Sequence, residues 1–142
     1  MKKVLLLTDK PFAQVAIDGI QKVVTDAGYE LKLCEKYGII LDNSEIETPA
    51  LLHARTGAEM ARELFGVSDE IYEAIRWHTT GKPDMSTLEK IIYLADFTEP
   101  TRDFEGVDVL RELSFEDLDE AMALGLSMSL GEIRARGAEP FG

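Results

Sequence analysis

Residues 78–103 read HTTGKPDMSTLEKIIYLADFTEPTRD, and they carry the strongest pattern in the chain. His78 stands where one predicted helix ends, and Asp96 stands close to the end of the next. Ser86 and Glu89 have the spacing of a capping box, which predicts that the second helix begins there. Small and charged polar residues follow both His78 and Asp96. This arrangement is typical of a site that binds a metal ion and phosphate.

Further helices are predicted on either side of this stretch. Thr48-Pro49 fits a helix cap followed by proline, and the apolar stripe beyond it ends at Gly66. Ser68 is expected to cap the next helix, and a last long helix is expected from near Ser114 to Gly137. The region 37–142 is therefore predicted to be mainly α, as a helical bundle.

The first 36 residues have a different pattern. Val4–Leu7 is a short continuous apolar run that predicts a buried strand, and Pro11 can open a helix. Ala27-Gly28 is expected to end that helix, and Tyr29–Leu33 alternates as a strand does. We therefore predict a small strand-helix-strand element over residues 1–36. Because two strands alone are marginally stable, we expect this element to pack against the rest of the chain or to pair with a second copy as a homodimer.

The composition argues against several classes of partner. The chain has 142 residues, enough for one compact domain, with 15 Lys and Arg against 27 Asp and Glu and a net charge of −12. This charge disfavours nucleic acid and anionic membrane surfaces. Cys34 is the single cysteine, and the apolar run within residues 1–8 is too short for the core of a signal peptide. We therefore expect a cytoplasmic protein. No apolar run in the sequence approaches membrane-spanning length.

The chain has two histidines, His53 and His78, and either could act with Asp96 as a metal ligand. Two imidazoles and a carboxylate suit zinc, iron or manganese, ions that lower the pKa of bound water. Arg102 could clamp phosphate oxygens, with Glu99 beside it. The same residues have plainer interpretations. A histidine beside a loop is usually a partly buried, hydrogen-bonded residue, and Arg102 with Glu99 is favoured as a surface ion pair.

Six segments together form a specific pattern. They are Lys36-Tyr37-Gly38-Ile39, residues 43–49, residues 50–53, residues 74–81, residues 88–96, and Glu99-Pro100 with Arg102-Asp103-Phe104. Through them the chain from about residue 37 to 137 resembles the YqeK-type HD-domain family, helical metallohydrolases that split diadenosine tetraphosphate symmetrically into two ADP.

The resemblance implies a nucleotide substrate and a divalent metal cofactor, with iron or manganese preferred. Carried over position by position, it implies three groups of residues. The metal ligands would be His53, His78 and Asp96, the substrate-binding residues Thr79, Thr80, Gly81 and Arg102, and the catalytic residues Glu99 and Arg102.

The resemblance is incomplete before His53. The family's site also uses an earlier histidine and a His-Asp doublet, and no histidine precedes His53 in this sequence. Three of the six expected ligands are present, and the resemblance implies that the two histidines serve one ion and Asp96 the other. Metal occupancy below one ion per chain is therefore compatible with the sequence. A recombined, truncated or designed chain would account for the pattern. Two functions stay open: a phosphohydrolase of dinucleoside polyphosphates, and a non-catalytic chimera or remnant of the HD fold with at most weak metal or nucleotide binding.

Residues 3–31 have a likeness of their own. The run Lys3–Phe12, continued through Asp18-Gly19-Ile20 to Ala27–Leu31, resembles the first strand-helix-strand of D-2-hydroxyacid dehydrogenases of the phosphoglycerate type. The cofactor signature GxGxxG occurs nowhere in the sequence, so no dehydrogenase activity is expected. We therefore expect the strand-helix-strand element over 1–36 to be followed by an HD-domain-like helical region over 37–142.

Overall fold

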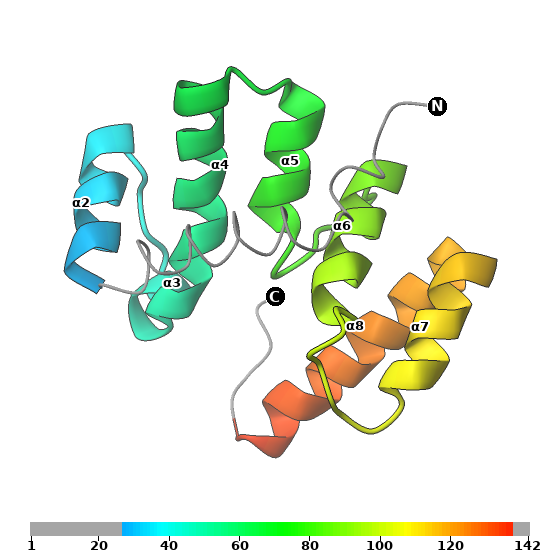
Figure 1. Cartoon of the computed structure of the whole chain (residues 1–142). Helices are drawn as coiled ribbons and strands as arrows, with labels where there is room; N and C mark the ends of the chain where they lie inside the picture. The colour runs from blue at the N-terminus through cyan, green and yellow to red at the C-terminus, as the bar shows by residue number, and fades with distance from the viewer. Residues whose placement is uncertain (1–26, 138–142) are drawn as a thin grey trace. The chain divides into compact units, whose positions relative to one another are not determined.

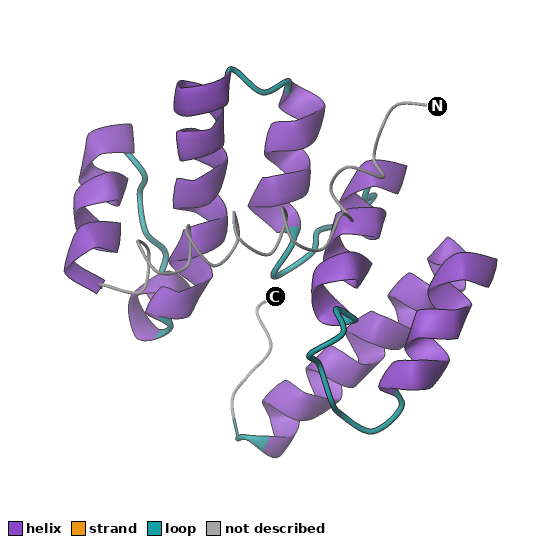
Figure 2. Cartoon of the chain, viewed as in Figure 1, coloured by secondary structure: helices purple, strands orange, loops and turns teal. Residues whose placement is uncertain are grey.

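The computed structural model describes residues 27–137, and every regular element in that part of the chain is a helix (Figure 1 and Figure 2). This confirms the mainly α fold predicted from the sequence. The chain forms two compact units, residues 1–76 and residues 77–142, and each unit is described by itself. Among the described residues, none of the helices has the length and apolar character needed to cross a membrane.

The first unit contains two longer helices that pack together and several shorter elements. Its elements are α2 (Ala27–Tyr37), α3 (Asn43–Glu47), the 3-10 helix η2 (Pro49–Leu51), α4 (Leu52–Phe65) and all of α5 (Asp69–Trp77) except its last residue. Helix α2 packs against α4, and Figure 1 shows α4 and α5 as neighbouring helices joined by a short loop.

Helix α4 ends and α5 begins where the sequence predicts. Gly66 has a φ of 59°, the left-handed conformation that glycine adopts without strain, and its N–H donates to the carbonyl of Arg62 at 3.0 Å. At the start of α5 the Ser68 hydroxyl accepts from the N–H of Ile71 at 3.4 Å. The proline of Thr48-Pro49 opens η2, and α4 itself starts at Leu52.

The strand predicted for Tyr29–Leu33 is wrong, because these residues lie inside α2. The buried positions of this helix are Glu30, Leu33 and Cys34, which are spaced as one face of a helix, while Leu31 is 55% exposed. The apparent alternation in the sequence therefore does not follow burial. The strand predicted for Val4–Leu7 and the helix predicted from Pro11 lie outside the described residues. The division of the chain at residue 36 stays a prediction, and α2 runs through that position without a break.

Glu30 is a buried carboxylate that makes the stability of the first unit depend on pH. Burial raises its pKa from 4.5 to about 6, partly offset by the Thr56 hydroxyl, which donates to the carboxylate at 3.2 Å. The neutral form of Glu30 is favoured in the folded state. Its contribution to the free energy of unfolding is therefore complete below a pH of about 4.5 and is lost as the pH rises through about 6.

We expect Glu30→Gln to stabilise the chain above the folded-state pKa. The amide removes the buried charge and keeps an acceptor for Thr56, so the free energy of unfolding should rise by about 1–2 kcal/mol at a pH of about 8 and change little at a pH of about 4. Urea denaturation at both pH values measures it. Glu35→Gln, an exposed change on the same helix, is the control. Equal unfolding free energies for Glu30→Gln and wild type at the higher pH would contradict the account.

An ion pair holds the segment before α4 against that helix. The Nη1 nitrogen of Arg55 donates to both carboxylate oxygens of Glu45, at 3.0 and 2.7 Å. It also donates to the carbonyl of Ile40 at 3.0 Å. Glu45 is 6% exposed, and it also exchanges hydrogen bonds with Asp42 at the start of α3. Since the charge is buried and paired, losing one partner would leave the other uncompensated. The pair thereby fixes the loop that leads to the first turn of α4.

The second unit is a three-helix arrangement in which α8 packs against both other helices (Figure 1). Its helices are α6 (Thr87–Phe97), α7 (Val107–Glu116) and α8 (Leu118–Ala135). Ser86 and Glu89 form the predicted capping box with both reciprocal hydrogen bonds. The core is apolar, and its buried members are Met85, Tyr93, Leu94, Leu110, Ala121 and Met122.

The single long helix predicted from near Ser114 to Gly137 is wrong, because the chain forms two helices there. The break is at Asp117, whose extended backbone, with φ −144° and ψ 104°, ends α7 and starts α8. The Asp117 carboxylate accepts from the N–H of Glu120 at 2.9 Å, so the residue acts as an N-cap. This break lets α8 turn back to cover both α6 and α7.

Leu110 lies at the centre of this core, with no exposed surface. We expect Leu110→Ala to lower the free energy of unfolding by about 2–5 kcal/mol, because the alanine leaves a cavity among closely packed side chains. Its neighbour Val109 is 61% exposed, and Val109→Ala should cost less than about 0.5 kcal/mol. Thermal or chemical denaturation of both variants measures the difference. Comparable losses for the two variants would show that the core is not centred on Leu110.

Candidate active site

His78 opens a tight turn that follows α5. The N–H of Gly81 donates to the carbonyl of Trp77 at 2.8 Å, and Gly81 has a φ of 69°. The hydroxyl of Thr79 lies 3.3 Å from Nε2 of His78, and the hydroxyl of Thr80 donates to the carbonyl of Gly81 at 3.1 Å. A glycine is required at position 81 because of its backbone conformation. The turn therefore brings His78, Thr79, Thr80 and Gly81 into one small segment of the second unit.

Lys82 connects this turn to the start of α6. Its ammonium lies 3.1 Å from a carboxylate oxygen of Glu89 and 5.8 Å from the centre of the Trp77 ring. Glu89 is 5% exposed and belongs to the capping box, so the ion pair is largely shielded from water. The turn is thus held from both of the helices that it joins.

Asp96, Glu99 and Arg102 come together at the other end of α6. The Arg102 guanidinium lies 3.9 Å from the Asp96 carboxylate and 3.7 Å from the Glu99 carboxylate. Glu99 also accepts from the backbone N–H of Thr101 at 3.0 Å. The Arg102 side chain is 49% exposed, and both separations exceed hydrogen-bond length, so the guanidinium can turn its donors towards an anion. The contact between Arg102 and Glu99 matches the surface ion pair of the plainer interpretation, and their role in binding phosphate stays a prediction.

Arg111 is a neighbour of this cluster that the sequence did not reveal. It lies on α7, and its guanidinium donates to backbone carbonyls of the segment that carries Glu99 and Arg102. A sequence does not indicate which backbone carbonyls accept a hydrogen bond from a side chain, because every residue has a carbonyl. No spacing or residue type could therefore have indicated this contact.

His53 is the second residue of α4, in the first unit. Its Nδ1 is hydrogen-bonded to the carbonyl of Ala50, one turn earlier. A carbonyl only accepts, so Nδ1 carries the proton, and in the neutral ring the lone pair lies on Nε2. Metal-binding histidines commonly donate their other ring nitrogen in this way. The local setting of His53 suits a ligand role.

The described residues supply metal-binding side chains but do not gather them into a metal cage. Within residues 27–137, no group of three or more His, Cys, Asp and Glu side chains is placed to hold a metal ion. His53 belongs to the first unit, while His78 and Asp96 belong to the second. Two imidazoles and a carboxylate are nevertheless a donor set that suits several divalent ions. The donor chemistry of these side chains is therefore compatible with a divalent metal ion.

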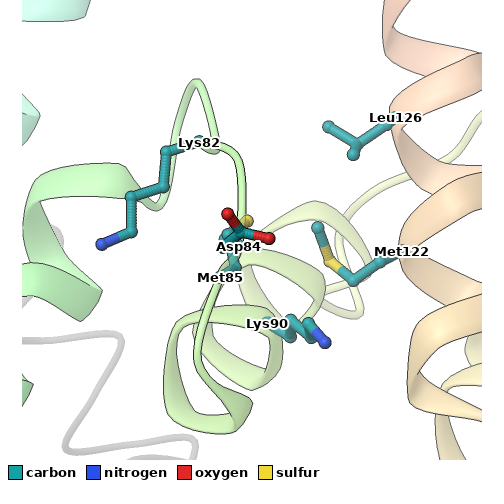
Figure 3. A pocket seen from close by; sticks show the side chains of 6 residues that line it. All are labelled: Lys82, Asp84, Met85, Lys90, Met122 and Leu126. Atoms are coloured by element: carbon teal, nitrogen blue, oxygen red, sulfur yellow. The ribbon is translucent and has the colours of Figure 1, made fainter.

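A shallow pocket of about 490 Å³ in the second unit adjoins the turn at Gly81 (Figure 3). It is lined by Lys82, Asp84, Met85, Lys90, Met122 and Leu126. In Figure 3 the Lys82 side chain extends away from Met122 and Leu126. Both lysines are paired with carboxylates, Lys82 with Glu89 and Lys90 with Asp119. The pocket therefore has an apolar wall and little unbalanced positive charge.

The chain belongs to the HD-domain family, whose pattern matches residues 29–101. It is similar to two proteins named symmetrical bis(5'-nucleosyl)-tetraphosphatase. The one from Bacillus subtilis is 51% identical over 75 residues, covering 52% of this chain and 40% of that protein. The one from Halalkalibacterium halodurans is 52% identical over 77 residues, covering 54% of this chain and 41% of that protein. The chain thus matches about two fifths of the length of these relatives.

A solved structure supports the same assignment. The crystal structure of an HD superfamily hydrolase from Clostridium acetobutylicum, described as involved in NAD metabolism, aligns with a TM-score of 0.75 and 35% identity. The alignment covers 81% of this chain and 61% of that one. The HD-domain resemblance is therefore confirmed. These comparisons do not support the dehydrogenase likeness of residues 3–31, and the HD match starts at residue 29, within α2.

Proposed function

We propose that the chain acts as an HD-type, metal-dependent phosphohydrolase of dinucleoside polyphosphates and converts diadenosine tetraphosphate into two ADP. The observation that carries this proposal is the 51% identity, over 75 residues, to a protein named for that substrate class. The HD match spans every predicted site residue except Arg102, which follows it directly. The HD family implies a divalent metal, and we propose iron or manganese as the ion.

In this proposal His53, His78 and Asp96 are metal ligands, the two histidines for one ion and Asp96 for a second. When bound, a divalent cation neutralises phosphate charge and lowers the pKa of water, which makes a nucleophile available near neutral pH. His53, whose Nδ1 lies at the carbonyl of Ala50, would bind the ion through its Nε2. Further ligands would be needed to complete the coordination, since a catalytic site commonly has three protein ligands for each ion.

The remaining residues act on the polyphosphate. The oxygen of water forms a bond to a phosphorus flanking the central anhydride bridge, and the central P–O bond breaks. One ADP leaves with the bridging oxygen, and the other gains the oxygen from water. Arg102 donates to the oxygens on which negative charge accumulates, and the Glu99 carboxylate lies 3.7 Å from its guanidinium. Thr79, Thr80 and Gly81 bind the substrate with hydroxyl and backbone groups.

The test is nucleotide turnover by the purified chain. The protein is stripped with a chelator, reloaded with manganese or ferrous iron, and incubated with diadenosine tetraphosphate. We expect ADP to form with either ion and to stop when the chelator is returned. The absence of metal-stimulated ADP release would exclude this function for the chain.

A second candidate is a non-catalytic remnant or chimera of the HD fold that binds a metal or nucleotide weakly. Two observations favour it: no histidine precedes His53, and residues 27–137 contain no group of three metal-binding side chains. Titration of the metal-loaded chain with ADP, together with the turnover assay on diadenosine tetraphosphate, distinguishes the two functions. Binding of ADP without turnover would support the remnant, whereas sustained turnover would eliminate it. A nucleotide partner follows from the phosphohydrolase function, and the homodimer and the cytoplasmic location stay predictions.

A further inference from the structure

Arg111 makes a dense set of hydrogen bonds to the segment that connects α6 to α7. Its Nε donates to the carbonyl of Thr98 at 2.9 Å. Its Nη2 donates to the carbonyl of Glu99 at 3.1 Å and to the carbonyl of Arg102 at 2.8 Å. The other terminal nitrogen pairs with the Asp108 carboxylate at 2.8 Å. All three types of guanidinium nitrogen are therefore engaged, and three of the four acceptors are main-chain oxygens.

These hydrogen bonds lie just beyond the C-terminus of α6, where the helix has no further backbone N–H groups to donate to the carbonyls. Helix α6 ends at Phe97, with Thr98 as its C-cap, so the carbonyls of Thr98 and Arg102 lie beyond the helical ladder. A basic side chain often satisfies carbonyls at a helix C-terminus. Arginine suits this position because its donors point in several fixed directions, whereas lysine offers donors from a single nitrogen.

The segment held by Arg111 carries the anion-binding part of the proposed site. Arg102 is one of its anchor points, Glu99 is another, and Asp96 lies on the last turn of the helix that precedes it. The Arg102 guanidinium is about half exposed and makes only long contacts with the two carboxylates. Side-chain contacts alone therefore hold Arg102 weakly, and the backbone beneath it is what Arg111 fixes.

We propose that Arg111 is a positioning residue that sets the backbone of residues 98–102, and through it the placement of Arg102 for the substrate's phosphate groups. This inference rests on the proposed function for its catalytic consequence. Its structural part, the fixing of the segment, stands by itself. Arg111 is not expected to touch the substrate.

Amide hydrogen exchange tests the structural part without any need for activity. We expect exchange at the amides of Thr101 and Arg102, which both donate to Glu99, to rise by about 10- to 100-fold in Arg111→Lys, which keeps the charge but loses the fork of donors. Exchange in the core of α8 should stay at the wild-type rate. Arg134→Ala, an exposed arginine change on α8, is the control and should leave the amides of Thr101 and Arg102 unchanged. Wild-type exchange at both amides in Arg111→Lys would overturn the inference.

A double-mutant cycle tests the catalytic consequence. With diadenosine tetraphosphate, Arg111→Lys should lower kcat by about 10- to 100-fold with a smaller change in KM, and it should have little further effect once Arg102 is alanine. An undiminished effect of Arg111→Lys in the Arg102→Ala background would overturn the role through Arg102. If the wild-type chain shows no turnover, the proposed function fails, and the exchange measurement still decides whether Arg111 fixes the segment.

Discussion

Arg102→Ala is expected to lower kcat/KM for diadenosine tetraphosphate by about 100- to 1,000-fold, the usual cost of removing a donor that stabilises charge in the transition state. Arg102 is suited to this role because its guanidinium is half exposed and its contacts with Asp96 and Glu99 are both longer than a hydrogen bond. Metal content should stay at the wild-type value, since the residue is not a ligand. Initial rates measured over a range of substrate concentrations give the comparison.

The matched control for this change is Arg134→Ala, which removes the same charge from an exposed position on α8. Its kcat/KM should lie within about twofold of wild type, because a distant surface charge acts mainly through screened, long-range attraction. If Arg102→Ala and Arg134→Ala lose activity equally, Arg102 acts through net charge, and its assignment to the phosphate-binding site is wrong.

Asp96→Asn is expected to abolish turnover, with a loss of activity of about 1,000-fold or more, and to lower the metal content of the protein. The amide is nearly isosteric with the carboxylate but carries no charge, so the fold should be retained while the ion loses an anionic ligand. Elemental analysis of the purified protein, together with initial rates, measures both effects. Far-ultraviolet circular dichroism should match that of the wild type.

Asp119→Asn is the control for this second change. Asp119 is an exposed carboxylate on α8 that pairs with Lys90, so the variant makes the same chemical change in the same unit. It should keep wild-type metal content and activity. Full metal content and turnover in Asp96→Asn would remove Asp96 from the site.

Much of the helical fold could be predicted because its signals are local. Ser86 with Glu89 and the left-handed Gly66 are capping features written within a few residues of sequence, and both are found where expected. The two failures come from patterns with more than one solution. Tyr29–Leu33 alternates as a strand would, yet burial of Glu30 and Leu33 follows a helix. The helix predicted from near Ser114 to Gly137 is broken at Asp117, because an acidic side chain fits both an N-cap and an exposed helix face.

The candidate site was predictable in its residue types and less so in its arrangement. His78 and Asp96 stand out because imidazole and carboxylate groups follow predicted helix ends, and the HD match includes both positions. The bond between His53 and a backbone carbonyl, and those from Arg111, depend on where the main chain passes in three dimensions. Such contacts use acceptors that every residue possesses, so a single sequence contains no signal for them.

The most direct test of the proposed function is hydrolysis of diadenosine tetraphosphate by the metal-loaded chain in water enriched in oxygen-18, with the products identified by mass spectrometry. Our account predicts ADP as the nucleotide product, with the label on the terminal phosphate of one of the two ADP molecules formed in each cleavage. Formation of AMP and ATP, or a lack of metal-dependent label in ADP, would contradict it.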